Sequence, residues 1–171
     1  LIAFGNTLNF EVEEIAAQEI DDVSVSSTKI RNAIVDGDIK TANEYLGYNY
    51  MLTGDVKKGK GIGRQLNFPT ANLFIKEKYK LIPKKGVYVV KSVINDKLFY
   101  GMMNIGFNPT VDGSSKSIEI HFFDFNLDIY GENIQVDILE RIRDEHKFNS
   151  LEELKTQLLK DKETSIAIIS S

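Results

Sequence analysis

Cysteine is absent from the 171 residues, and histidine occurs only twice. The absence of cysteine excludes disulfide bonds, thiolate metal sites and cysteine nucleophiles, and it suits a reducing compartment, so we expect a cytoplasmic protein. His121 and His146 lack the spacing of paired zinc ligands, which argues against a zinc site, and nothing in the sequence suggests a Ser-His-Asp triad. The longest apolar run is far shorter than a membrane span, so we expect no membrane partner.

A basic character over the whole chain is also missing. The net charge is −4, yet basic residues outnumber acidic ones by nine to two between Gly54 and Lys85. Proteins that bind nucleic acids are usually basic across a whole face. A local basic segment in an acidic chain therefore favours a small anionic ligand over a nucleic acid.

The chain from Tyr48 onward has the pattern of β structure. Residues 50–56 alternate in the manner of a half-buried strand, and Asn95-Asp96 predicts a tight hairpin turn. Further strands are expected at residues 86–94, 98–105, 117–125 and 134–142. Short strands without intervening helices predict an antiparallel barrel or sandwich. A parallel sheet needs crossover helices, for which this segment has no room.

Residues 1–47 lack this regular β pattern. Residues 10–15 alternate weakly and are compatible with a short strand. Two short helices are then predicted by cap residues, the run Ser26-Ser27-Thr28 and Gly37 around the first and Asp38 and Gly47 around the second. This segment is too short to close a core of its own, so we interpret it as the end of a larger domain followed by a helical linker.

A longer helix is predicted near the end of the chain. Ser150 and Glu153 have the spacing of a capping box. Leu151, Leu154 and Leu158 then form one apolar stripe at helical spacing. We expect this stripe to pack on the β structure.

Three glycines, Gly59, Gly61 and Gly63, stand beside Lys60 and Arg64. Such a loop lets backbone amides converge on an anion while the two cations add charge, although glycine-rich hairpin loops are also common without a ligand. The segment is not a Walker A loop, because Gly61 stands where a Ser or Thr must bind the metal. It is not a dinucleotide fingerprint either, because the third glycine comes one residue early.

Thr70 and Asn72 offer polar groups suited to phosphate chemistry. They are two residues apart, which places a hydroxyl and a carboxamide on one side of an extended chain. Neutral oxygens suit a Mg²⁺ ion that already carries phosphates, but the same residues also occur where a capped turn starts a strand.

Residues 117–125 alternate strictly. The core face is assigned to Ile118, Ile120 and Phe122, and the opposite face to Glu119, His121, Phe123 and Phe125. A carboxylate at Glu119 could accept a hydroxyl proton, or it could simply be exposed to solvent.

Taken together, these motifs resemble those of riboflavin kinases. The segment 59–73 resembles the opening motif of that family, and later segments resemble its further motifs in the family order. Those segments are residues 86–88, 104–110, 119–125 with 128–131, and 143–148. Residues 25–31 are similar to the final motif of the FMN adenylyltransferase half of bacterial bifunctional FAD synthetases. The nucleotide-binding histidine motif of that half is not in this chain.

The resemblance implies a mainly β fold, a Greek-key antiparallel β-barrel with a C-terminal helix. It implies a kinase domain at residues 48–171, and at residues 1–47 a short α/β remnant of the adenylyltransferase domain with its linker. The implied reaction moves the γ-phosphate of ATP to the 5′-hydroxyl of riboflavin, giving FMN and ADP, without adenylyltransferase activity in this chain. The implied partners are these small molecules and the adenylyltransferase half.

The resemblance also implies roles for single residues. Thr70 and Asn72 are expected to bind Mg²⁺ and the ATP phosphates, and Glu119 is the expected general base. Arg143 and Phe148 are expected to close over the flavin. The expected phosphate cradle consists of Gly59, Lys60, Gly61, Gly63 and Arg64.

One residue departs from the family pattern. Asn67 stands where the family usually has glycine before Phe-Pro-Thr, and asparagine tolerates a positive φ, so we expect the turn to survive.

Two other functions stay open. One is a catalytically silent barrel that binds flavin or nucleotide. The other is a single-strand nucleic-acid-binding barrel with Phe122, Phe123 and Phe125 as a stacking platform.

Overall fold

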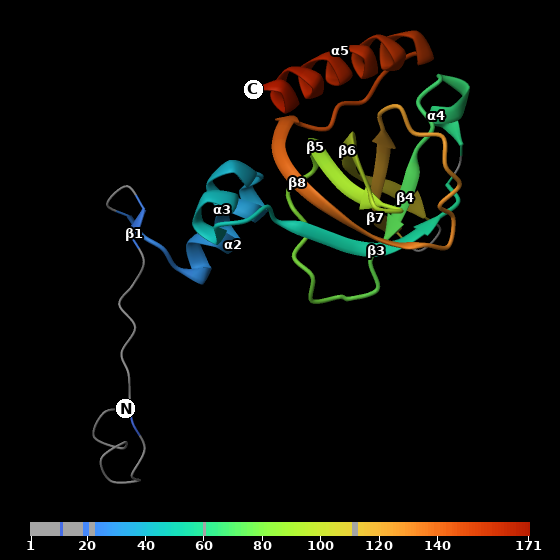
Figure 1. Ribbon diagram of the computed structural model, residues 1–171. Helices are drawn as coiled ribbons and strands as arrows, with labels where there is room; N and C mark the ends of the chain where they lie inside the picture. Colours follow the sequence, from blue (N-terminus) through green and yellow to red (C-terminus); the bar gives the residue numbers. More distant parts are fainter. Residues whose placement is uncertain (1–10, 12–18, 21–22, 60, 111–112) are drawn as a thin grey trace.

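The computed structural model describes residues 11, 19–20, 23–59, 61–110 and 113–171. Within them, six antiparallel strands close into a barrel, with one long helix across it and two short helices at its side (Figure 1). The predicted mainly β barrel with a C-terminal helix is therefore confirmed. Among the described helices, none combines the length and the apolar character needed to cross a lipid bilayer.

The barrel strands are β3 (Met51–Lys57), β4 (Ala71–Phe74), β5 (Gly86–Ile94), β6 (Lys97–Thr110), β7 (Gly113–Phe122) and β8 (Asn133–Arg143). The helices are α2 (Ser27–Asp36), α3 (Ile39–Leu46), α4 (Ile62–Gln65) and α5 (Leu151–Ser170), and a small ribbon pairs β1 (Glu19–Ile20) with β2 (Val23–Ser24).

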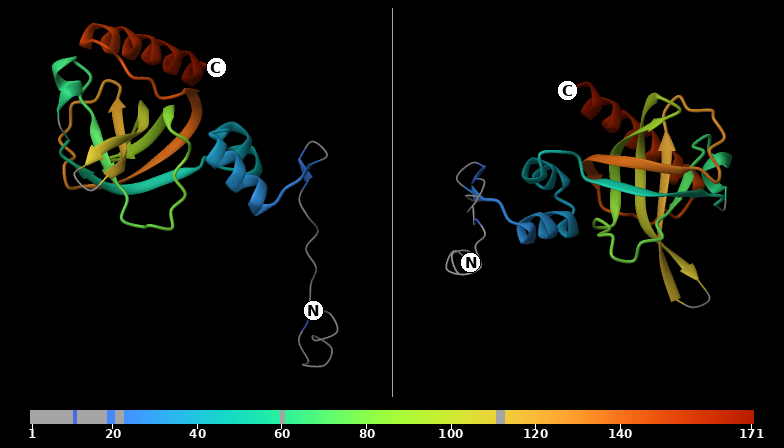
Figure 2. Two further views of the ribbon diagram at one scale, coloured as in Figure 1. Left: turned by 180° about the vertical axis from the view of Figure 1, so that it is seen from behind. Right: turned by 60° about the horizontal axis from the view of Figure 1, so that its bottom comes forward.

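The strands follow one another around the barrel in the order β3-β4-β7-β6-β5-β8, and β8 closes onto β3. Consecutive strands β5, β6 and β7 lie side by side, and β8 returns to the free side of β5. That arrangement is a Greek key. The β6–β7 hairpin extends beyond the barrel wall (Figure 2). The turn at Asn95-Asp96 has positive φ at both residues, as a tight hairpin turn requires.

The barrel core follows the alternation of the strands. In β3 every second residue is buried, and in β7 the core face is Ile118, Ile120 and Phe122, as predicted. β5 differs because it is buried on both faces. Its outer Val87 belongs to a second cluster with Leu66, Phe68, Met102 and Phe123, against which residues of α5 pack. This covered outer face holds the cavity under α5 described below.

The end of β7 differs from the prediction. The strand stops at Phe122, and Asp124 has a φ of +50°, which turns the chain back. Phe125 therefore packs on Phe99 and Phe122 instead of sharing the face of Glu119. The predicted common face is wrong at this one residue. Phe122 and Phe123 are 4% and 8% exposed, so they are not an open stacking platform for nucleic acid.

The predicted caps of the helices are confirmed. Ser26 and Asp38 accept backbone N–H groups at the starts of α2 and α3, and Gly37 and Gly47 end these helices with positive φ. Ser150 caps α5 by accepting the N–H of Glu153.

The predicted apolar stripe of α5 is wrong at its first residue. Leu151 is 49% exposed, whereas Leu154 and Leu158 pack on the second cluster. The helix also runs through the chain end to Ser170, which the pattern of residues 165–171 did not indicate.

The two short helices lie beside the barrel (Figure 1), and α3 packs against β8. Ile39 is fully buried in the barrel core cluster. Asn43 donates to the carbonyl of Ile138 at 3.0 Å and accepts from the backbone N–H of Tyr50 at 2.7 Å. The boundary at residue 47 stays a prediction, and the predicted strand at residues 10–15 lies outside the described residues.

Candidate active site

A row of polar side chains crosses the outer face of the barrel. Strand register places Asn72 opposite Glu119, Glu119 opposite Asn104, and Val87 opposite both Asn104 and Arg143. Residues that face each other across adjacent strands point to the same side of a sheet. Their sequence neighbours, such as Ile120, fill the core, so this row faces outward. Four strands thereby place a carboxamide, a carboxylate, a second carboxamide and a guanidinium in one line.

The first cavity lies over this row, between the barrel wall and α5, and has a volume of about 270 Å³. Its polar groups include Asn104, Glu119, His121 and Arg143. Its apolar walls come from both sides and include Phe68, Val87, Met102, Phe148, Leu154 and Leu158. An apolar slot with a few convergent polar groups is the usual form of a small-molecule site.

A second cavity of about 370 Å³ lies beside the glycine-rich loop. Lys58 and Arg64 line it as cations, and Thr70 and Asn72 line it with neutral oxygens. Gly59 and Gly61 also line it, so the backbone of the loop borders the cavity. Asp128 lines the cavity as well, and the remaining groups suit a polyanion that carries a metal ion.

Two glycines of the loop are closely packed, Gly63 against backbone and Gly59 against a side chain. A Cβ atom on Gly59 would lie 2.1 Å from the carboxamide nitrogen of Asn72, and a Cβ on Gly63 would lie 2.2 Å from the carbonyl oxygen of Phe68. The N–H of Phe68 also donates to the carbonyl of Gly63 at 2.8 Å. Asn67 has a φ of +64°, so the predicted survival of this turn with asparagine is confirmed.

A third cavity, of about 560 Å³, opens at the barrel mouth. Its walls include core-facing residues such as Ile120 and Phe122 and the chain from Asn126 to Tyr130. Arg64 and Pro69 line both this cavity and the one beside the loop. Thr70 lines all three cavities, so they converge at the Pro69–Thr70 segment.

Arg143 ties α5 to the barrel. Its Nε and Nη2 donate to the two carboxylate oxygens of Asp161 at 2.8 and 2.7 Å, and Asp161 is 1% exposed. Its Nη1 donates to the backbone carbonyl of Asp144 at 2.9 Å. The guanidinium also lies 5.9 Å from the ring centroid of Phe148. Both residues expected to close over a flavin therefore line one cavity and contact each other.

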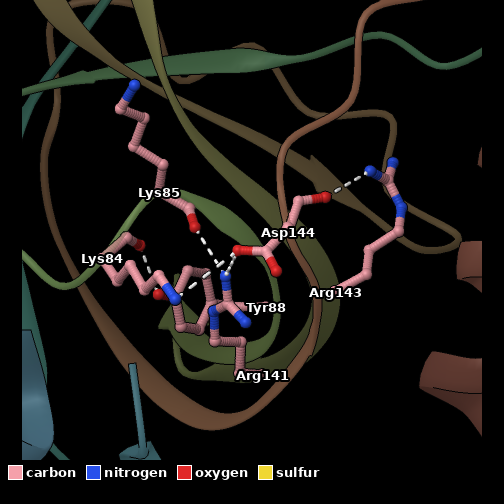
Figure 3. Close-up of polar contacts among 6 residues, drawn as sticks. All are labelled: Lys84, Lys85, Tyr88, Arg141, Arg143 and Asp144. Carbon is pink, nitrogen blue, oxygen red and sulfur yellow. Dashed lines mark hydrogen bonds and ion pairs between the residues drawn. The ribbon is translucent and has the colours of Figure 1, made fainter. Parts of the chain in front are cut away.

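The loop that follows β8 is held at its first residue. Figure 3 shows Asp144 between two arginines, with Arg141 donating to its carboxylate at 2.6 Å and Arg143 to its carbonyl. Arg141 holds the pKa of Asp144 below its usual value. Arg141 also donates to the carbonyl of Lys85 at 2.7 Å. These bonds fix the root of the segment that carries Glu145, His146 and Phe148 into the cavity under α5.

The predicted site residues fall into two groups. Glu119, Arg143 and Phe148 line the cavity under α5, and Gly59, Gly61, Arg64 and Asn72 line the cavity beside the loop. Thr70 belongs to both groups. Gly63 was expected in the phosphate cradle but lines the cavity under α5, and Lys60 lies outside the described residues. The catalytic and binding roles of these residues stay predictions.

Three residues of the site were missed from the sequence. His121 lines the cavity two residues after Glu119, and the alternation of β7 already placed them on one face. Asp161 gave no local signal, and Asn104 was noted only as the start of the segment 104–110 that resembles a family motif. Their positions depend on strand register and on an ion pair between residues 18 positions apart.

Comparison with known proteins gives consistent matches. The family model described as riboflavin kinase (Flavokinase) matches residues 46–169. The bifunctional riboflavin kinase/FMN adenylyltransferase of Bacillus subtilis is 40% identical over 163 residues, which are 94% of this chain and 50% of that protein. The protein of the same name from Haemophilus influenzae is 38% identical over 100% of this chain and 55% of its own length. The chain thus spans about half the length of these curated relatives.

Two solved structures are similar in fold. A crystal structure named as a macrolide-efflux protein from Streptococcus pneumoniae has 40% identity and a TM-score of 0.86, over 95% of this chain and 53% of that one. The riboflavin kinase of Trypanosoma brucei has 23% identity and a TM-score of 0.50, over 71% of this chain and 80% of that one. The second likeness shows the fold alone.

Proposed function

The chain belongs to the riboflavin kinase family, and on that premise we propose that it transfers the γ-phosphate of ATP to the 5′-hydroxyl of riboflavin. The products are FMN and ADP. The observation that carries this proposal is the convergence of the cavities at Thr70. A carboxylate lies in one cavity and a phosphate-binding loop in the next, which is the arrangement that a transfer between two bound substrates needs.

The nucleotide is assigned to the two cavities that share Arg64 and Pro69. Its phosphates lie beside the loop, where Lys58 and Arg64 offset their charge and the backbone of Gly59 and Gly61 approaches closely. The base enters the barrel mouth, which is wide and partly apolar. The mouth joins the loop at Thr70, so one molecule spans both cavities.

A Mg²⁺ ion fits the donor set of this site. Among the described residues, no group of three or more acidic, histidine or cysteine side chains gathers to hold a metal. The hydroxyl of Thr70 and the carboxamide of Asn72 supply neutral oxygens beside the phosphate groove, and Mg²⁺ usually combines few protein ligands with substrate phosphates and water. When bound, the ion neutralises charge on the phosphates.

Riboflavin is assigned to the cavity under α5. The apolar walls from Phe68, Val87 and Leu158 suit the flat ring system, and the ring of Phe148 closes one side. The volume of about 270 Å³ is below the roughly 300 Å³ at the lower end of ligand pockets. We therefore assign the ring to this cavity and the ribityl chain to its exit at Thr70.

Glu119 is the proposed general base. It lies in the outward row directly beside Asn72, so the carboxylate and the metal-binding carboxamide occupy adjacent strands. In the reaction the O5′–Pγ bond forms and the bond from Pγ to the β–γ bridging oxygen breaks. The hydroxyl proton passes to Glu119, and the bridging electrons stay on ADP.

A chromatographic assay tests the function. The chain is incubated with riboflavin, ATP and MgCl₂, and riboflavin, FMN and FAD are then separated. We expect FMN without FAD, since the nucleotide-binding histidine motif of the adenylyltransferase half is not in this sequence. No FMN from folded chain, with riboflavin still bound, would instead favour the silent binding barrel.

Glu119→Gln tests the base within the same assay. We expect kcat to fall by roughly 10²–10⁴, while riboflavin binding stays within about threefold. Glu132→Gln is the matched control, because Glu132 is exposed and lines none of the three cavities. Turnover of Glu119→Gln within a few-fold of the parent chain would show that Glu119 is not the base.

The domain organisation is part of this proposal. We assign residues 48–171 to the kinase unit and residues 1–47 to the end of an adenylyltransferase half with its linker. The family match begins at residue 46, and the relatives that share this name are about twice as long as the chain. The partner of the kinase unit is then the adenylyltransferase half of the same polypeptide.

A further inference from the structure

The segment that carries Thr70 receives little support from the strand ladder. β4 begins at Ala71, and its pairing with β7 consists of Ala71 with Ile120 and Asn72 with Glu119. Pro69 has no backbone N–H and cannot extend that ladder as a donor. The residue on which all three cavities converge therefore lies where backbone pairing has ended.

A side-chain hydrogen bond from β7 holds the chain just before β4. Nδ1 of His121 lies 2.9 Å from the carbonyl oxygen of Pro69. A carbonyl oxygen only accepts hydrogen bonds, so the proton must be on Nδ1. His121 stands two residues after Glu119 on β7 and lines the same cavity. One strand thus carries the carboxylate and also holds the backbone next to Thr70.

The imidazole is held in place by aromatic rings. The ring of Phe68 lies 5.0 Å from it and that of Phe123 lies 5.8 Å from it, both in edge-to-face geometry. Both phenylalanines are buried in the cluster under α5. Burial lowers the pKa of His121, the bond to Pro69 partly opposes this, and the charge of Lys162 lowers the pKa further. The neutral ring therefore has a fixed orientation and a single tautomer near pH 7.

Building on the proposed kinase function, we propose that His121 is a positioning residue for phosphoryl transfer. Its Nδ1–H bond to Pro69 fixes Thr70, and with it the phosphate groove, relative to Glu119. A merely structural histidine would contribute stability and leave the reaction unchanged. A positioning histidine changes kcat because displacing reacting groups by about 1 Å costs on the order of 10²-fold in rate.

Three substitutions separate these roles. His121→Asn keeps an N–H donor near the position of Nδ1, whereas His121→Gln and His121→Leu do not. We expect the Gln and Leu variants to lose roughly tenfold to 10²-fold in kcat and to show a raised KM for ATP. Their Kd for riboflavin should stay within about threefold. His121→Asn should recover most of the loss.

The matched control removes a comparable bond elsewhere. The hydroxyl of Ser92 is buried and donates to the carbonyl of Gln135 at 2.6 Å, away from the three cavities. Ser92→Ala should lower the urea midpoint and leave kcat and both KM values unchanged. It shows what the loss of one side chain-to-carbonyl bond does without any link to Thr70.

The outcomes separate this inference from the function on which it rests. If the parent chain forms no FMN, the kinase proposal fails first. If the parent chain is active and His121→Leu or His121→Gln keeps kcat within twofold, the positioning role is refuted. Equal loss in the Asn and Gln variants also refutes it, because only Asn keeps a donor near the position of Nδ1. If the Leu variant does not fold, the Asn and Gln pair decides.

Discussion

The ion pair between Arg143 and Asp161 offers a quantitative test of how α5 is attached. Asp161 is 1% exposed and accepts two hydrogen bonds from Arg143 and one from Gln157 at 2.8 Å. Asp161→Asn removes the charge, halves the acceptors and turns an NH₂ group toward a guanidinium. The substitution therefore leaves a cation in a largely buried place without its anion.

The expected cost follows from the burial of the two partners. Breaking a buried pair by removing one partner costs about 3–5 kcal/mol. The side chain of Arg143 is 22% exposed and keeps its bond to Asp144, so the lower end, about 3 kcal/mol, applies. For a chain of this size, about 2–4 °C is lost per kcal/mol, which predicts a drop in Tm of roughly 6–12 °C.

Urea unfolding followed by far-UV circular dichroism measures this cost, with tyrosine fluorescence as a second probe because the chain has no tryptophan. Asp137→Asn is the control, since this carboxylate accepts a bond only from Gln135 in the described structure. The double substitution Arg143→Met with Asp161→Leu should be more stable than Asp161→Asn, because it removes the unpaired charge. A loss below about 1 kcal/mol for Asp161→Asn, or a double variant no better than it, would refute the reasoning.

Two further predictions concern the loop and the response to pH. Gly59→Ala should push the carboxamide of Asn72 away. The KM for ATP should then rise about tenfold, as the loss of one charge-assisted contact implies, while riboflavin binding stays unchanged. An unchanged KM for ATP in steady-state assays would contradict this prediction. Because the pKa of His121 is lowered below its ordinary 6.5, the unfolded chain takes up this proton at a higher pH than the folded chain. The contribution of His121 to the free energy of unfolding is therefore fully present above pH 6.5 and declines as the pH falls toward the lowered pKa. The urea midpoint at a series of pH values measures this decline, which should be smaller in His121→Asn; an equal decline in both chains would contradict it.

Local signals in the sequence predicted most of the fold. The caps at Ser26 and Ser150 and the turn at Asn95 depend on residues within four positions of one another, so they are visible without the structure. The alternation of β3 and β7 likewise reports the core face directly. Asn67 in the left-handed region belongs to the same class, because its tolerance for positive φ is a property of the residue itself.

Features that depend on distant contacts were not predictable in this way. The outer face of β5 is buried because α5 covers it, and nothing in the pattern of β5 indicates a covering helix. The bond from His121 to Pro69 joins residues 52 positions apart. Leu151 fits the apolar period of α5, yet it is exposed, since the period cannot show how far the covered surface extends. The site was therefore predictable as a set of residues but not as a geometry.

The closure of the barrel between its first and last strands has a consequence for the order of events during synthesis. Leu52 pairs with Val136, so one edge of β3 can pair only after β8, about eighty residues later in the chain, has been synthesised. Long-range pairing of this kind is slow, because the entropy of closing the loop is lost before the contacts form. The capped helices α2 and α3 need only local contacts and can form early. A ribosome-bound chain that ends before β8 has every residue that lines the cavity beside the loop, but β3 and β5 still lack the strand that pairs with both of them in the closed barrel.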